Sequence, residues 1–183
     1  MLNLIVTPFP ESVGLNPILY ERVCENIFKD DQTKPNLNGK KGAKITGFNL
    51  HELGIKEINY FLTWIRNILP IVSGRFSSKK EDETSFGFDV NGFKIEECWG
   101  IHYNGNESLI EHNHFPYILS FVYYVKTPKG SAPIMFGTDR YEVKEGECVF
   151  FLASQYHSVL PNESEGRCAI VGNISYVGEA EHR

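Results

Sequence analysis

The chain has 183 residues, of which 42% are hydrophobic and 22% charged, and its formal net charge is −5 at pH 7. This length suits one domain that buries about 70% of its unfolded surface. The sequence has no basic block, which argues against a groove that follows the phosphates of a nucleic acid. No apolar stretch approaches the ~20 residues needed to cross a bilayer, so we expect no membrane anchor.

The first part of the chain predicts a short strand at 2–6, followed by a helix. Asn16 followed by Pro17 is typical of an N-cap with proline at the first helical position. Apolar residues then recur at intervals of three and four, which predicts an amphipathic helix to about Lys29.

A second apolar stripe predicts a helix over 55–69, and Pro70 marks its expected end. The polar segments at 30–44 and 73–85 are rich in charged residues or contain Gly and Pro, so we interpret them as connections. Together with the segment 104–111, they are candidates for a lid that sets specificity.

After Phe86 the sequence consists of short runs rich in β-branched and aromatic residues, separated by clusters of turn residues. Such spacing is typical of an all-β sandwich or barrel rather than of βαβ units. We therefore predict a single domain that is mainly β. It comprises a double-stranded β-helix (jelly roll) at 86–178, with two N-terminal supporting helices and loops at 1–85. The predicted strands lie at 93–103, 118–125, 134–136, 141–143, 147–152 and 167–177.

The cysteines Cys24, Cys98, Cys148 and Cys168 are widely spaced and form no C-x-x-C pair. Cys148 and Cys168 lie in apolar runs typical of strands, which favours buried free thiols. Free thiols persist in a reducing compartment, so we expect a cytoplasmic protein.

Two histidines with one residue between them, His112 and His114, precede the strand predicted at 118–125. Residues i and i+2 of an extended strand point to the same face, so both imidazoles would project together. Two converging imidazoles can occupy adjacent positions on a metal ion, and His157 is the candidate third ligand. A purely structural interpretation stays open, because H-x-H also occurs as two solvent-facing residues of a loop.

Arg167 begins the last predicted strand, and Ala169 and Asn173 share its side. A guanidinium directed into the jelly roll is costly unless an anion meets it, preferably a bidentate carboxylate. The small side chain of Ala169 leaves room for such a ligand. The opposite face of this strand is also apolar, so the alternative stays open that Arg167 is a surface charge. Tyr103 shares a strand face with Trp99 and Ile101 and could equally be a core residue.

The sequence from Tyr103 to Arg167 resembles the Fe(II)- and 2-oxoglutarate-dependent oxygenases, especially their prolyl-4-hydroxylase-like branch. The resemblance rests on Tyr103 followed nine residues later by His112, and on His157 followed ten residues later by Arg167. The segments HNHFPYILSFVYYVKTPKGSAPIMF and FFLASQYHSVLPNESEGRCAIVGN are also similar to a family of uncharacterised oxygenases of bacteria and phages with an H-x-H metal motif. The similarity covers roughly residues 93–175.

This resemblance implies that the three histidines hold Fe(II) and that 2-oxoglutarate is the cosubstrate. It implies that Arg167 pairs with the distal carboxylate of 2-oxoglutarate and that Tyr103 donates a hydrogen bond to it. Asn173 shares the side of Arg167 and joins the predicted cosubstrate site. The implied activity couples oxidative decarboxylation of 2-oxoglutarate to oxidation of a substrate, for which a peptidyl side chain such as proline and a small molecule are both candidates.

His114 departs from the superfamily, which usually has Asp or Glu at this position. Three neutral imidazoles leave Fe(II) with two net positive charges and also suit Zn, Ni, Co or Cu ions. Glu107 in the preceding loop is a weak candidate for an additional ligand, and Glu111 points to the other face. Two alternatives therefore stay open: a cupin-like three-histidine metalloenzyme that does not use 2-oxoglutarate, and a non-catalytic metal-binding module.

Overall fold

The computed structural model describes residues 3–29, 43–77 and 92–177, and the predicted domain boundary at 85/86 lies outside these ranges. The described part is mainly β, with two helices and two antiparallel sheets, neither of which closes into a barrel. The elements are, in order, β1 (Ile5–Pro8), α1 (Ser12–Lys29), β2 (Lys44–Ile45), the short 3₁₀ helix η1 (Leu50–Glu52), α2 (Lys56–Ser77), β3 (Phe93–Asn104), β4 (Leu109–His112), β5 (Leu119–Lys126), β6 (Ile134–Phe136), β7 (Asp139–Tyr141), β8 (Glu147–Leu152), β9 (His157–Val159) and β10 (Glu165–Tyr176).

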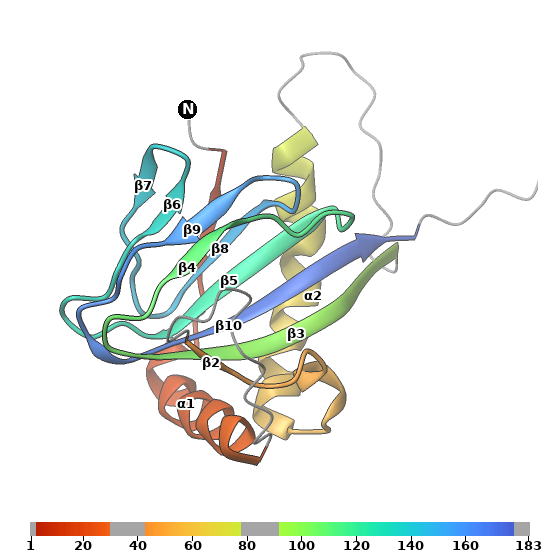
Figure 1. Cartoon of the computed structure of the whole chain (residues 1–183). Coiled ribbons are helices and arrows are strands. Elements are labelled where there is room, and N and C mark those ends of the chain that lie inside the picture. Colours follow the sequence, from red (N-terminus) through yellow and green to blue (C-terminus); the bar gives the residue numbers. More distant parts are fainter. Residues whose placement is uncertain (1–2, 30–42, 78–91, 178–183) are drawn as a thin grey trace, which may run out of the picture.

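The larger sheet has the strand order β1-β8-β5-β10-β3-β2, and the smaller sheet has the order β4-β9-β6-β7. The central strands of the larger sheet, β5 and β10, are apolar at most positions and buried along nearly their whole length, as expected of strands covered on both faces. Figure 1 shows the two helices against one face of the larger sheet and the smaller sheet over the other. Neither helix in the described ranges is long and apolar enough to cross a membrane.

Two hydrophobic clusters use the opposite faces of the larger sheet. The helix-side cluster joins α1 and α2 to the sheet, and in it the ring of Phe61 lies 4.5 Å from that of Tyr123, centroid to centroid. The inter-sheet cluster includes Tyr124 and Val122 of β5 together with Ile134 and Val159 of the smaller sheet. Burial of each such side chain stabilises the fold by about 1.5–3 kcal/mol. The alternation along β5 therefore ties all three layers together.

Helix α1 begins at Ser12, ahead of the predicted N-cap, so Pro17 lies inside the helix and that prediction was wrong. Asn16 is buried, and its Oδ1 accepts a hydrogen bond from the hydroxyl of Tyr123 instead of capping the helix. The missing N–H of Pro17 would have met the carbonyl of Val13, a residue that is 92% exposed. Because water can satisfy that carbonyl, the cost of the proline at this point is small.

The sequence predicted that the second helix ends at Pro70, but α2 continues to Ser77. The predicted connection at 73–85 therefore begins inside the helix. Val72, beyond the proline, is buried in the helix-side cluster. Most helical stability in proteins comes from such packing, and here it offsets a cost of about 3 kcal/mol for an interior proline.

The predicted strands at 134–136 and 147–152 have the bounds of β6 and β8. The strand predicted at 141–143 was wrong, because Gly137, with φ +60°, closes a tight turn that pairs Phe136 with Asp139. Such a two-residue turn fixes β7 immediately after β6. Strands β2 and β9 were not predicted, and of β4 only an extended conformation around His112 and His114 was expected.

Candidate metal centre

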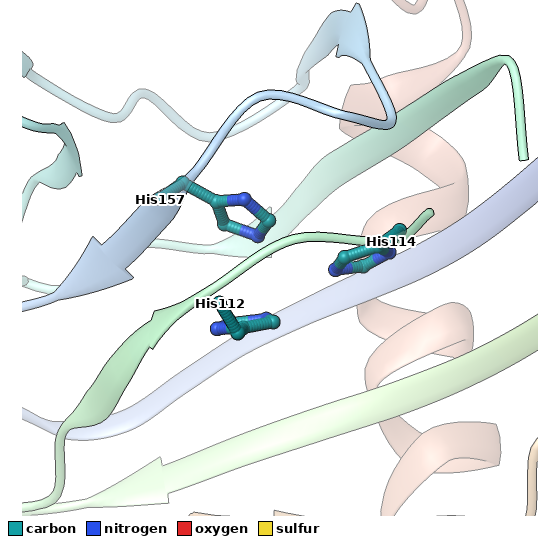
Figure 2. A group of neighbouring side chains, drawn as sticks. All are labelled: His112, His114 and His157. Carbon is teal, nitrogen blue, oxygen red and sulfur yellow. The ribbon is translucent and has the colours of Figure 1, made fainter. Parts of the chain in front are cut away.

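Three histidine rings converge between the two sheets (Figure 2). His112 ends β4, His157 begins β9, and the two residues are direct cross-strand partners. His114 follows β4, and its backbone N–H donates to the carbonyl of Ala153 at 2.7 Å. The ring centroids lie 4.3 Å apart for His112 and His157, 4.9 Å for His114 and His157, and 5.2 Å for His112 and His114.

The ligand nitrogens of the three rings all lie within 4.8 Å of one another. No other group of three or more His, Cys, Asp or Glu side chains in the described ranges is placed to share a metal ion. Strand β4 stops at His112, so the two neighbouring histidines do not share one regular strand as expected. Their rings nevertheless stack at 25° and face His157 together.

Each of the three rings uses Nδ1 for a hydrogen bond to an oxygen. His112 and His157 donate to the backbone carbonyl two residues earlier in the chain, at 2.8 and 3.1 Å. His114 donates to Oδ1 of Asn173. A neutral imidazole that donates through Nδ1 keeps its Nε2 lone pair for a metal. The hydrogen bonds therefore leave three Nε2 atoms available as ligands.

His114 and His157 are 8% and 4% exposed. Burial, with the nearby ring of His112 as a further cause, lowers the pKa of His157 to about 3. Burial also lowers the pKa of His114. Both rings are consequently neutral near pH 7, which is the form that binds a metal ion.

A cavity with about 410 Å³ of empty space, counting its open mouth, extends from the histidines toward Arg167. Most of its wall is aliphatic or aromatic and comes from both sheets, including Trp99 and Ile101 of β3 and Ile134 of β6. An apolar cavity with a few convergent polar groups is the usual form of a small-molecule site.

Arg167 is 2% exposed and faces this cavity. Its guanidinium carbon lies 4.6 Å from the ring centroid of Tyr103 and 5.8 Å from that of Tyr124. Within the described part of the chain, Nε and Nη1 of Arg167 have no hydrogen-bond partner, and the hydroxyl of Tyr124 also lacks one. Burying a charge without a partner costs on the order of several kcal/mol, so an anion is the expected ligand here.

Tyr103 is buried and is the cross-strand partner of Arg167. Burial raises the pKa of Tyr103 to about 12, with Arg167 acting against the shift and Glu107 adding to it. The phenol is therefore protonated and can donate a hydrogen bond to an anion held by Arg167. The carboxylate of Glu107 accepts the N–H of Asn104 and is not part of the histidine group, and Glu111 is exposed.

The predicted cosubstrate residue Asn173 lies outside the cavity, and two further candidates, Glu97 and Tyr124, were not assigned a functional role from the sequence. Asn173 does not line the cavity but lies behind His114, and its amide also contacts Glu97. Glu97 has the same parity in β3 as Trp99 and Tyr103, so a carboxylate in an inward-facing series was a visible signal. The inward position of Tyr124 depends on the sheet register, which the sequence leaves open.

No protein-family model matches the chain, and neither does any curated protein sequence. A prolyl-4-hydroxylase from Pseudomonas putida aligns with a TM-score of 0.64 and 19% identity, over 96% of this chain and 93% of that one. A viral collagen prolyl hydroxylase from Paramecium Bursaria Chlorella virus-1, in a 2OG complex, aligns with a TM-score of 0.61 and 14% identity over 97% of each chain.

The non-heme alpha ketoglutarate dependent epimerase SnoN from nogalamycin biosynthesis aligns with a TM-score of 0.67 and 10% identity, over 98% of this chain and 80% of that one. These proteins catalyse different reactions, so what the present chain shares with all of them is the architecture. The chain therefore has the fold of the prolyl hydroxylases and other 2OG-Fe(II) oxygenases.

Proposed function

We propose that the protein is an Fe(II)- and 2-oxoglutarate-dependent oxygenase. The observation that carries this proposal is one cavity that holds both three imidazoles with available Nε2 atoms and the buried guanidinium of Arg167, whose Nε and Nη1 have no hydrogen-bond partner among the described residues. A metal ion satisfies the imidazoles, and a carboxylate satisfies the guanidinium. A keto acid with a second, distal carboxylate can reach both at once.

The residues fit these roles. His112, His114 and His157 would hold the iron through nitrogen and would leave it accessible to a chelating cosubstrate and to dioxygen. Arg167 holds the distal carboxylate through Nε and Nη1, and the hydroxyl of Tyr103 donates to it. When bound, iron and 2-oxoglutarate supply the oxidising power for substrate oxidation, with succinate and CO₂ as coproducts.

The apolar wall around these groups excludes water, which strengthens the pairing of Arg167 with an anion. For Asn173, predicted as a cosubstrate ligand, we propose a role through His114, because its amide contacts that ring.

The similar proteins differ in the reactions they catalyse, so two substrate classes are candidates for this chain. One of them is described as a collagen prolyl hydroxylase and another as an epimerase of nogalamycin biosynthesis. A peptidyl side chain such as proline and a small molecule are thus both substrate candidates here.

We further propose that the chain forms one domain, a double-stranded β-helix supported by α1 and α2, because both helices share a cluster with the larger sheet. Its free cysteines, of which Cys98, Cys148 and Cys168 are buried, suit the reducing cytoplasm.

Anaerobic titration of the Fe(II)-loaded protein with 2-oxoglutarate tests the proposal. We expect a metal-to-cosubstrate charge-transfer band, and we expect Arg167→Ala to weaken 2-oxoglutarate binding by about tenfold or more, as for removal of one partner of a buried charged pair. Arg140→Ala is the matched control, since Arg140 is exposed and pairs with Glu142. It should leave the titration unchanged.

The result also separates the alternatives. A metal-loaded protein without the band, in which Arg167→Ala changes nothing, would favour a three-histidine metalloenzyme that does not use 2-oxoglutarate. A protein that gives the band but no succinate, with or without added candidate substrates, would favour a non-catalytic module. If a His157→Ala variant bound iron as tightly as wild type, the three histidines would not form the proposed metal centre.

A further inference from the structure

Three polar side chains lie in one row across the larger sheet, behind His114. Ser120 of β5 and Glu97 of β3 are the cross-strand partners of Asn173 on either side of β10. Ser120 is fully buried and Asn173 is 3% exposed. Polar groups at this depth need hydrogen-bond partners, and these three supply them to one another.

The hydrogen bonds of this row have one direction. The carboxylate of Glu97 accepts from Nδ2 of Asn173 at 2.8 Å, which places Oδ1 of the amide on the opposite side. That oxygen accepts the hydroxyl of Ser120 at 2.9 Å and faces Nδ1 of His114. Because Oδ1 has no proton to give, His114 carries its proton on Nδ1 and presents a free Nε2.

The row also ends on a negative charge, which distinguishes His114 from the other two histidines. His112 and His157 donate to neutral backbone carbonyls. A metal ion at Nε2 makes the Nδ1–H more acidic, and a hydrogen bond that leads to a carboxylate stabilises that state. Three neutral imidazoles bring no negative charge to a divalent ion. Glu97 supplies a negative charge that is linked to His114 through two hydrogen bonds, one on each side of the Asn173 amide.

We propose that Glu97 and Asn173 are positioning residues that hold His114 in its Nδ1-protonated form and contribute, through the amide of Asn173, the negative charge that the three histidines lack. The inference rests on the metal centre of the proposed function and does not depend on 2-oxoglutarate. It assigns to Glu97 a role in metal affinity although the residue touches no metal ligand directly.

The tautomer is measured in the metal-free protein by ¹⁵N NMR of the histidine side chains. We expect His114 to be protonated on Nδ1 only, and we expect Asn173→Leu, which keeps a similar shape, to give a mixture of the two tautomers. A wild-type His114 protonated on Nε2 would overturn the inference whatever the affinity measurements show.

Affinity is measured by titration with Co²⁺ alone, followed by its visible absorption. Removing an outer-shell partner of a metal-bound histidine typically weakens binding about 10–100-fold, so Glu97→Gln should weaken Co²⁺ binding by about tenfold. Glu96→Gln is the matched control, because it removes the same charge one residue away. Glu96 pairs with Lys94 and Ser175 instead, each at 2.6 Å, and its loss should change the affinity by less than about twofold.

A charge exchange separates this role from a merely structural one. Asn173→Asp alone places two carboxylates against each other and should weaken Co²⁺ binding. Combined with Glu97→Gln, the aspartate accepts directly from His114 while the glutamine amide donates to it, so affinity should return to within about threefold of wild type. The inference would be overturned if the double variant had no higher affinity for Co²⁺ than either single variant.

The failures are distinguishable. If wild type and His157→Ala bind Co²⁺ equally weakly, the metal centre fails and this inference fails with it. If wild type binds tightly and Glu97→Gln binds as tightly as Glu96→Gln, only the role of Glu97 is lost. Thermal unfolding of every variant checks that each one is folded at the temperature of the titration.

Discussion

Two neighbouring tyrosines in β5 show how one sheet serves both stability and binding. The hydroxyl of Tyr123 points to the helix side and donates to Asn16 of α1. Tyr124 lines the cavity beside Arg167, and its hydroxyl makes no hydrogen bond of good geometry with the described residues, although it lies close enough to interact with that guanidinium. A buried hydroxyl without a partner costs stability, so its retention at Tyr124 is explained by a ligand that accepts its hydrogen bond.

Tyr124→Phe should therefore change stability and affinity in opposite senses. Removing an unsatisfied buried hydroxyl should leave the free energy of unfolding of the ligand-free protein unchanged or raise it, by up to about 1–3 kcal/mol. Loss of a donor to the carboxylate should weaken 2-oxoglutarate binding by about tenfold. Urea unfolding and calorimetric titration measure the two quantities.

Tyr123→Phe is the natural control, since it removes the same atom one residue earlier. It should lower the free energy of unfolding by about 1–3 kcal/mol, because Asn16 loses its partner, and leave 2-oxoglutarate affinity as it was. If both variants lower the affinity for 2-oxoglutarate equally, the hydroxyl of Tyr124 has no specific role in binding it.

At the scale of elements, the sequence predicted what local chemistry decides and missed what pairing decides. Strands β6 and β8 were predicted with their observed bounds because their side chains are almost all apolar. Strands β4 and β9 are short and partly polar, and they form because β9 pairs with β4 on one side and with β6 on the other. The spacing indicated the histidines as ligands, but the register that sets His112 opposite His157 joins segments far apart in the chain.

The same limit applies to the residues behind the site. Glu97 meets Asn173 only because β3 and β10 pair in one particular register. A shift of that register by one residue would reverse the face of every side chain in β3. The residue types were visible in the sequence, whereas their meeting point is a property of the assembled sheet.

Gly172 in β10 illustrates how tightly the larger sheet is packed on its helix side. A Cβ at this position would lie 2.4 Å from the ring of Phe121 and 3.2 Å from the carbonyl oxygen of Glu97. Gly172→Ala should lower the free energy of unfolding by about 1–3 kcal/mol, as overpacking of a close-packed core does. Chemical unfolding monitored by tryptophan fluorescence measures the change.

Gly74→Ala provides the comparison for that substitution. Gly74 lies in α2, and a Cβ there would meet nothing within 4 Å. In an open helical position alanine is favoured over glycine, so this variant should gain about 0.5–1 kcal/mol. Equal effects at the two glycines would contradict the close approach of Phe121 to β10.

At the scale of the molecule, the three layers separate the candidate site from the helix-side core. The site lies between the two sheets, and the helices cover the opposite face of the larger sheet (Figure 1). The helix layer is also joined to the sheet by a polar contact, in which the hydroxyl of Tyr20 in α1 lies 3.0 Å from Nε2 of His102 in β3. This contact lies on the helix side of the sheet, and neither Tyr20 nor His102 lines the cavity with the candidate metal ligands, so it can be changed without replacing a residue of the site.

The burial of His102 at this point should make the stability of the chain depend on pH. Burial, followed by the charges of Lys44 and Lys126, lowers the pKa of His102 in the folded protein. In the unfolded chain the ring has its ordinary pKa of about 6.5, so below that pH the unfolded state takes up a proton that the native state refuses. The contribution of His102 is therefore complete above about pH 6.5 and is lost as the pH falls through its folded pKa.

The variant His102→Gln isolates this contribution, because glutamine can still hydrogen-bond to Tyr20 but does not titrate. The free energy of unfolding of metal-free wild type and variant should be measured in urea at several pH values on either side of 6.5. Wild type should lose more stability on acidification than the variant, so the difference between the two curves changes steadily below that pH. Parallel curves would mean that His102 takes up its proton equally readily in the folded and unfolded states, contrary to its place beneath α1 and beside two lysines.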